Sequence, residues 1–379
     1  MRMKEKVHDF VASRVEKGNY PGCQVIVARG EEILAEQYLG SMVKGSDRSE
    51  DRVTENTLFN LESITKVMVT LPLAFKLLEE GRLCLEDRLA EYLPEFATSE
   101  EKKRVTFRDM LNFTGGISLL DPPGSEAAAA AGDMQKCWQC HYEQPLETSP
   151  GSRVFYSDVS CRLLGKALER ISGMDLQEGA RKYFFEPLGM NRTFYCPPNR
   201  EECADTGISE SRRPLRGQLC QDLEHNMGEI LGSDGIFSTA RDMLRFSRMI
   251  LQEGTLEGMR VLGPLAAERM TGEITNPNLC EEPVSYLHYI LSGPKVWFWE
   301  YAQSPFSFFG DLCSSRGIGK MGGAGTFLYL DPEYDLAVIY LTNYGQPENT
   351  LEGDAAWNLF QKNINVMGLC NLVLGELRL

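Results

Sequence analysis

The two ends of the chain carry strand patterns, whereas the long stretch between them carries helix patterns. Apolar residues alternate with polar ones between Cys23 and Gly40 around a glycine-containing turn, which predicts a β-hairpin. Residues 326–343, TFLYLDPEYDLAVIYLTN, predict two further strands joined by a turn. Strands from opposite ends share one sheet when the helices between them form an insertion. The sequence therefore predicts an α+β fold, an antiparallel sheet flanked by helices with an inserted, mostly helical domain.

The length of 379 residues is enough for two to three domains, at roughly 100–200 residues each. We assign residues 1–60 and 226–379 to the sheet domain and residues 61–225 to the helical domain. Residues 58–81, at the start of the helical domain, have helical spacing, and Gly81 is expected to end that helix.

The charge balance narrows the choice of partners. The chain has 39 Lys and Arg against 54 Asp and Glu, a formal charge of −15. Nucleic acids and anionic membranes require clustered positive charge, so a small-molecule substrate is the expected partner, and the oligomeric state is left open. No apolar run approaches the roughly 20 residues of a membrane span, and no signal peptide is visible. With 11 cysteines, an odd number, the sequence predicts reduced thiols and a cytoplasmic location.

Several familiar catalytic patterns are absent. The sequence has no Gly-x-Ser-x-Gly elbow, no HExxH, no Walker loop, and 4 histidines in unrelated contexts. The run Cys137-Trp138-Gln139-Cys140-His141 formally matches a haem-attachment pattern, but the chain lacks an export signal and further ligands nearby. We interpret this cysteine cluster as incidental, with metal or thiol chemistry as the alternative, and expect no cofactor and no metal.

The strongest candidate for chemistry is Ser63-Ile64-Thr65-Lys66. Side chains three apart on a helix are neighbours, so Lys66 can reach the Ser63 hydroxyl and activate it as a nucleophile. The same Ser-x-x-Lys spacing also begins at Ser41, Ser99 and Ser292, and Ser99 has the context of a helix cap. Taken alone, the motif is equally typical of a capping serine followed by a solvated lysine.

Two further motifs follow it in a recognisable order. Residues 156–158 read Tyr-Ser-Asp after PGSRVF, and residues 320–322 read Lys-Met-Gly before GAGTFLYLDPE. With FNLESITKVM around Ser63, the chain resembles the serine β-lactamase and penicillin-binding-protein superfamily. The resemblance is greatest to class C β-lactamases, D-alanyl-D-alanine carboxypeptidases and family VIII carboxylesterases, and it implies a β-lactamase/transpeptidase-like fold.

The resemblance also implies roles for individual residues. Ser63 would be the nucleophile, with Lys66 and Tyr156 sharing the role of base. A cationic Lys66 would lower the pKa of the Tyr156 phenol. The backbone N–H groups of Ser63 and Gly323 would form the oxyanion hole. The residues implied for substrate binding are Asp158, Lys320, Met321 and Gly322.

Two of these residues depart from the family pattern. Asp158 replaces an Asn, and a carboxylate cannot donate a hydrogen bond to a substrate carbonyl. Asp158 is expected to keep Lys66 protonated, and not to act as a base itself. Met321 replaces a Thr and removes a hydroxyl that grips a substrate carboxylate. Both changes put β-lactam and peptide recognition in doubt, while Lys320 still predicts a preference for acidic substrates.

The predicted function is therefore that of a serine hydrolase acting through a Ser63 acyl-enzyme on a small ester or amide. The alternatives are an acyltransferase using the same intermediate, a D-amino-acid peptidase or weak β-lactamase, and a binding or sensor relative without turnover. The aromatic run at 297–309 is either core packing or an apolar wall of the substrate pocket.

Overall fold

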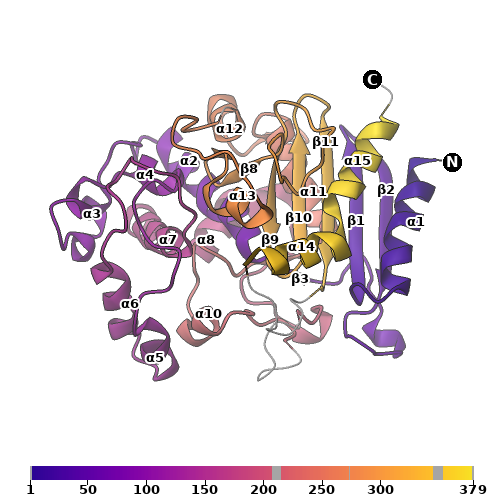
Figure 1. The fold of residues 1–379 in the computed structure, drawn as a ribbon, viewed down its shortest axis with the longest axis horizontal. Helices are drawn as coiled ribbons and strands as arrows, with labels where there is room; N and C mark the ends of the chain where they lie inside the picture. Colours follow the sequence, from indigo (N-terminus) through magenta and orange to yellow (C-terminus); the bar gives the residue numbers. More distant parts are fainter. Residues whose placement is uncertain (1, 207–214, 273, 345–352, 378–379) are drawn as a thin grey trace.

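The computed structural model describes residues 2–206, 215–272, 274–344 and 353–377. Within these residues the main sheet has seven strands in the order β2-β1-β11-β10-β9-β8-β7, and every neighbouring pair is antiparallel (Figure 1). The predicted hairpin and strand pair are confirmed, and they lie side by side through β1 and β11. The strands of this sheet are β1 (Gly22–Arg29), β2 (Glu32–Gly40), β7 (Lys295–Val296), β8 (Trp299–Tyr301), β9 (Ile318–Gly322), β10 (Thr326–Asp331) and β11 (Leu336–Thr342).

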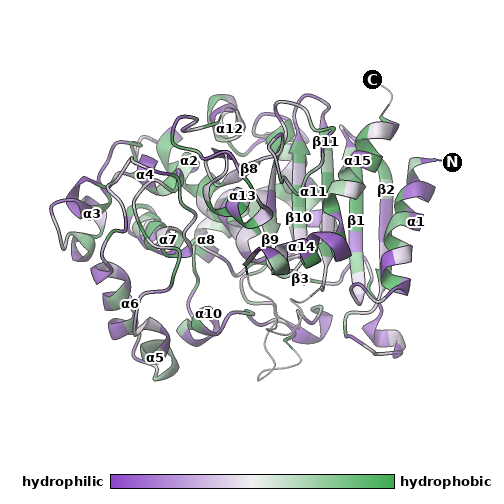
Figure 2. Ribbon diagram, in the orientation of Figure 1, coloured by the Kyte–Doolittle hydropathy of each residue, from purple (hydrophilic) through white to green (hydrophobic). Residues whose placement is uncertain are grey.

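Helices cover both faces of the central strands, which explains why those strands are apolar without interruption. Along β10, Phe327 and Tyr329 pack into one hydrophobic cluster, and Leu328 and Leu330 pack into the other. The first cluster is closed by α1 (Met3–Glu16), α14 (Gly353–Ile364) and α15 (Val366–Glu376), and the second by α11 (Ala240–Leu251) and the helical region. Figure 2 shows hydrophobic residues concentrated along these strands.

The helical region lies beside the sheet, on the left in Figure 1. Its elements fall within the range predicted for the helical domain except for the last two residues of α10, and the division into two domains stays a prediction. The helices there are α2 (Leu71–Glu79), α3 (Leu89–Tyr92), α4 (Phe107–Leu111), α5 (Ser125–Ala130), α6 (Met134–Glu143), α7 (Asp158–Ser172), α8 (Leu176–Ala180), α9 (Glu186–Leu188) and α10 (Asp222–Met227). The remaining elements are α12 (Pro264–Thr271), α13 (Tyr286–Ser292), and the short strand pairs β3 (Phe59–Asn60) with β4 (Phe237–Ser238) and β5 (Thr255–Leu256) with β6 (Met259–Arg260).

The segment around the nucleophile is not the single helix that its spacing predicts. After β3 comes a 3₁₀ turn at Glu62–Ile64, then a π-helical turn at Lys66–Thr70, and only then α2. Pro72 has no amide hydrogen and its ring clashes with the carbonyl four residues earlier, so an α-helical turn cannot run unbroken into it. The predicted helix end is confirmed, because the Gly81 N–H donates to the Leu78 carbonyl.

The aromatic run at 297–309 forms part of the sheet and core. Trp297 and Trp299 are buried around β7 and β8, strands that the sequence analysis did not predict, and Phe308 and Phe309 pack under the sheet. Of this run, Glu300 lines the pocket around Ser63. These contacts favour the packing interpretation. Of the helices that the structure describes, none combines the length and apolarity needed to cross a membrane.

Candidate active site

Ser63 lies on a tight turn that two hydrogen bonds of Glu62 hold in place. Glu62, just before it, has a positive φ of 42°, which is strained for a non-glycine residue. The Glu62 N–H donates to Asn60 Oδ1 at 2.9 Å, and its buried carboxylate accepts the N–H of Ala324 at 2.8 Å. The second bond ties the turn to the end of β9, so it fixes Ser63 relative to Gly323.

Lys66 is buried and has an acceptor for each of its three ammonium hydrogens. Its Nζ lies 2.8 Å from Ser63 Oγ, 2.6 Å from the Ser233 carbonyl oxygen and 2.6 Å from Asp158 Oδ1. A protonated lysine offers three donors and no acceptor. The geometry therefore fits an ammonium ion, whose hydrogen bond occupies one lone pair of Ser63 Oγ.

Tyr156 completes the contacts of the nucleophile. Its hydroxyl lies 2.8 Å from Ser63 Oγ and donates to Asp158 Oδ1 at 3.2 Å. Ser157 holds this segment in place: its hydroxyl caps α7 by accepting the Ser160 N–H at 3.1 Å and donates to the Ser118 carbonyl at 2.6 Å. Asp158 is the first residue of α7, where the helix dipole favours a negative charge.

The electrostatics assign a charge to each group. Burial alone would lower the pKa of Lys66, but the charges of Asp158 and Tyr156 raise it well above its ordinary value. Burial opposes ionisation of Asp158, yet Lys66 and Arg162 bring its pKa below the usual range. At neutral pH the pair is therefore an ammonium ion beside a carboxylate, as the sequence predicted for Lys66.

The predicted lowering of the Tyr156 pKa is wrong. Burial raises this pKa well above 10.0, the negative charge of Asp158 raises it further, and Lys66 offsets only part of the increase. The resting group is a phenol. Since Tyr156 donates to Asp158 and Lys66 donates to Ser63, the hydroxyl proton of Ser63 points to the Tyr156 oxygen.

A pocket of about 210 Å³ opens at Ser63. It brings together the predicted residues Ser63, Tyr156, Asp158, Lys320, Met321 and Gly323. Gly322 lies behind it in β9, where a Cβ would come within 2.3 Å of the Leu61 carbonyl oxygen. The oxyanion-hole and substrate-binding roles stay predictions. Pocket residues that the sequence analysis missed include Leu119, Gln221, Leu287, Ile290, Leu291 and Trp357.

Lys320 has a partner that the sequence analysis did not anticipate. Its Nζ lies 2.5 Å from Glu300 Oε1, and both side chains are only 1% exposed. The expected preference for acidic substrates relied on an unpaired ammonium group. Because Lys320 is paired with Glu300, this basis for the predicted acidic preference is absent.

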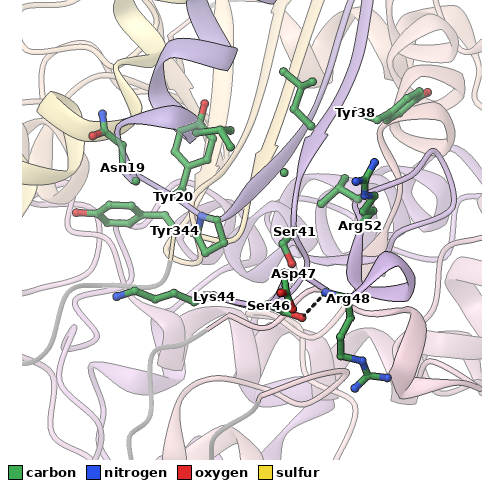
Figure 3. Close-up of a pocket in the computed structure, with 17 residues that line it drawn as sticks. Asn19, Tyr20, Tyr38, Ser41, Lys44, Ser46, Asp47, Arg48, Arg52 and Tyr344 are labelled. Atoms are coloured by element: carbon green, nitrogen blue, oxygen red, sulfur yellow. Dashed lines mark hydrogen bonds between the residues drawn. The ribbon is translucent and has the colours of Figure 1, made fainter.

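The competing Ser-x-x-Lys motifs lack this geometry. Ser41 and Lys44 line a larger cavity of about 780 Å³ beside the end of β2, where Lys44 points away from Ser41 (Figure 3). The Ser41 hydroxyl instead donates to the Asp51 carbonyl at 3.1 Å. Ser99 accepts the Lys102 N–H at 3.2 Å in the turn before the 3₁₀ helix at Lys102–Arg104, but the N-cap of that helix is Glu101, so Ser99 is not the predicted helix cap.

The cysteine cluster lies on α6, away from the pocket-lining residues. Burial raises the pKa of Cys137 to about 11, so its thiol is unreactive at neutral pH. His141 bonds to the Cys137 carbonyl through Nδ1 at 2.9 Å, and its Nε2 lies 3.3 Å from Arg162. Across the described ranges, no group of three or more His, Cys, Asp or Glu side chains is placed to hold a metal ion.

A serine held between a lysine and a tyrosine, at the edge of an antiparallel sheet flanked by helices, defines a class of serine-acylating enzymes. The chain belongs to the Beta-lactamase family, whose profile matches residues 7–361. It is a serine hydrolase of that family.

Individual relatives share this architecture. The chain is 26% identical, over 88% of its length and 80% of the relative's, to a protein of Escherichia coli K12 described as "Putative D-alanyl-D-alanine carboxypeptidase". The solved structure of EstCE1, a hydrolase with promiscuous acyltransferase activity, is 19% identical, covers 96% of this chain and 98% of its own, and has a TM-score of 0.70. A class C beta-lactamase in complex with cefoxitin is 20% identical, covers 99% of both chains, and has a TM-score of 0.69.

Proposed function

We propose that the protein hydrolyses small esters or amides through an acyl-enzyme on Ser63. The observation that carries this proposal is the placement of Ser63 Oγ, 2.8 Å from both Lys66 Nζ and the Tyr156 hydroxyl, at the mouth of a pocket. A nucleophile with a proton acceptor and a charged donor both within hydrogen-bond reach is the arrangement that covalent catalysis requires.

The hydrogen bonds define a path for the proton. As Ser63 Oγ attacks the substrate carbonyl carbon, its proton passes to the Tyr156 oxygen, and the phenol proton shifts toward Asp158 along the 3.2 Å bond. Lys66 remains an ammonium ion and stabilises the alkoxide that develops on Ser63. The sequence analysis gave Asp158 only an electrostatic role, and this path adds a proton-accepting one.

The same path returns the proton when the intermediate collapses. The Tyr156 hydroxyl protonates the leaving alcohol or amine, and the acyl group stays on Ser63. The N–H groups of Ser63 and Gly323 hold the carbonyl oxygen throughout both steps. Water then attacks the acyl-enzyme, giving its proton to Tyr156, and the acid product leaves with Ser63 regenerated.

A second candidate function is transfer of the acyl group to an alcohol or amine. The support for it is the fold shared with EstCE1, whose own acyltransferase activity is promiscuous. Ester consumption with an added alcohol would then yield a new ester as well as the free acid, and mass spectrometry of the products separates the two outcomes.

The proposal is tested by mapping the site of acylation. A fluorophosphonate probe should label Ser63, and Ser63→Ala should lose labelling and nearly all turnover on a panel of p-nitrophenyl esters, D-amino-acid amides and a chromogenic cephalosporin. Ser41→Ala, in the competing motif, is the matched control and should retain both. Label on another serine would overturn the assignment, and a burst without turnover would indicate a sensor.

We also propose that the protein works in the cytoplasm, without nucleic acid or membrane partners. The support is its charge of −15 and its eleven cysteines, all of them in the described part of the chain and none disulfide-bonded there. A reducing compartment keeps such thiols free.

A further inference from the structure

The Lys320–Glu300 ion pair lies in the wall of the active-site pocket, where it controls the charge that a substrate meets. Lys320 is on β9 and Glu300 is on the neighbouring strand β8. Both residues border the pocket that contains Ser63, and the two charged atoms are 2.5 Å apart. A substrate carboxylate that approached Lys320 would meet an ammonium group whose charge Glu300 already neutralises.

The contacts of Lys320 compensate its charge: its Nζ donates to Glu300 Oε1. Its Nζ also lies 4.9 Å from the centre of the Tyr156 ring, within cation–π range. The other titratable groups that act on it are Lys66 and Cys161. Burial lowers the pKa of Lys320 and Lys66 lowers it further, so the attraction of Glu300 is what favours its charged form.

Glu300 adds a feature that disfavours an anionic substrate directly. Its second oxygen, Oε2, is buried and has no hydrogen-bond partner among the described residues. The other buried lysine nearby, Lys295, donates instead to the Tyr289 carbonyl at 3.0 Å. The negative charge on Glu300 Oε2 is not compensated by a hydrogen bond from the described part of the chain, and it would repel a carboxylate bound in the adjacent pocket.

The rest of the pocket wall is mainly apolar on the side away from the catalytic groups. Met321 follows Lys320 on β9 and replaces the hydroxyl that the family resemblance would place there. Apolar side chains complete this wall: Leu287, Ile290 and Leu291 from α13, Trp357 from α14, and Leu119. Such a surface binds hydrocarbon and offers nothing to a charged group.

From the ion pair, the free oxygen and the apolar wall, we propose that Glu300 is a specificity-determining residue that cancels the charge of Lys320 and restricts the enzyme to substrates with an uncharged acyl group. This inference rests on the proposed function and deepens it. It is the opposite of the acidic preference that the sequence alone predicted.

The test compares two esters with the same leaving group, p-nitrophenyl butyrate and mono-p-nitrophenyl succinate. The readout is the ratio of kcat/KM for the acidic ester to kcat/KM for the neutral one. We expect the wild-type ratio to be below one. Glu300→Gln should raise it by roughly tenfold or more, the scale of one charge-assisted hydrogen bond.

The increase of this ratio in Glu300→Gln should depend on pH and arise mainly from a lower KM for the acidic ester. Without Glu300 the buried Lys320 loses its proton more easily, so the gain should be larger at pH 6 than at pH 9. A merely structural effect of the substitution would lower kcat for both esters and leave the ratio unchanged. The matched control is Glu282→Gln, which removes the same charge from an exposed residue outside the pocket and should leave the ratio unaltered.

The double variant Glu300→Gln/Lys320→Met keeps the test decisive if the single variant does not fold. Replacing both members of a buried ion pair is tolerated far better than breaking it. Its ratio should equal the wild-type ratio, whereas a tenfold fall would show that Lys320 binds carboxylates in the native enzyme and would overturn the inference. Absence of turnover on both esters in the wild type would count against the proposed function instead.

Discussion

Replacement of Asp158 by Asn tests the electrostatic core of the site. The change removes one negative charge 2.6 Å from Lys66 Nζ and leaves the shape of the side chain intact. Coulomb's law with an effective dielectric constant of about 20 gives about 6 kcal/mol for charges at that distance. Asp158 is 21% exposed, so solvent screens part of this attraction. Opposite charges in such contacts shift a pKa by about 1–3 units, so loss of Asp158 should lower the pKa of Lys66.

The sign of the effect follows from which form of Lys66 is active. In the native protein Asp158 keeps the pKa of Lys66 above its ordinary value, so the ammonium form persists into strongly alkaline solution. In Asp158→Asn, burial lowers this pKa without that opposition. Activity that needs the ammonium ion should therefore be lost at lower pH, so the alkaline limb of the pH profile should move to lower pH. The plateau should fall too, because an amide cannot take a proton from Tyr156.

The rate of Ser63 labelling by a fluorophosphonate, measured between pH 6 and pH 10.5, isolates acylation from later steps. Asp234→Asn is the matched control. Asp234 is buried nearby, and burial together with Glu224 raises its pKa and so favours its uncharged form; its substitution should therefore move the limb less than Asp158→Asn does. If the alkaline limb of the labelling rate does not move in Asp158→Asn, the reasoning about Lys66 is refuted.

Three further predictions concern the oxyanion hole, the buried charges and metals. Gly323→Ala should reduce kcat, and urea unfolding should show a loss of about 1–3 kcal/mol in stability, because the new Cβ would lie 2.5 Å from Glu62 Oε2. Native activity and stability in this variant would contradict the prediction. Arg162→Met should lower the free energy of unfolding by about 3–5 kcal/mol, because it leaves the buried Glu224 carboxylate without its ion-pair partner; both side chains are 1% exposed. Arg162→Met/Glu224→Leu should recover part of that loss. Dialysis against EDTA should leave ester turnover unchanged, and activity restored by one metal would contradict the interpretation of the cysteine cluster.

The strands at the two ends of the chain were predictable because each is long, apolar and bounded by clear turns. The three short strands β7, β8 and β9 were harder. Lys295–Val296 and Trp299–Tyr301 are too short to show a period, and β9 includes two glycines and a lysine. Their strand conformation comes from pairing in series, β9 with β10, β8 with β9 and β7 with β8, and local sequence does not encode these contacts.

Within the site, the predicted residues that meet at Ser63 belong to motifs with fixed spacing. The residues that were missed act through contacts distant in sequence. Glu300 reaches Lys320 across a strand pair, and nothing in WFWEYAQ distinguishes its one carboxylate from a surface residue. The Tyr156 pKa was predicted in the wrong direction for a similar reason, because the sequence shows the neighbouring charges but not the depth of burial.

The carboxylates of Asp158 and Glu300 have the same effect on the charge of the site. Asp158 is paired with Lys66 and Glu300 with Lys320, so each lysine of the site has a carboxylate within 2.6 Å. In the resting enzyme neither ion pair adds a net positive charge toward the reacting carbonyl, and Lys320 stays paired during the proposed proton transfer. In the proposed mechanism the oxyanion is stabilised by fixed backbone dipoles, the N–H groups of Ser63 and Gly323, whose positions depend on the bond from Ala324 to Glu62. On this argument the strained turn at Glu62 contributes more to the rate than the charge of Lys320, and Gly323→Ala should lower kcat more than Glu300→Gln/Lys320→Met does.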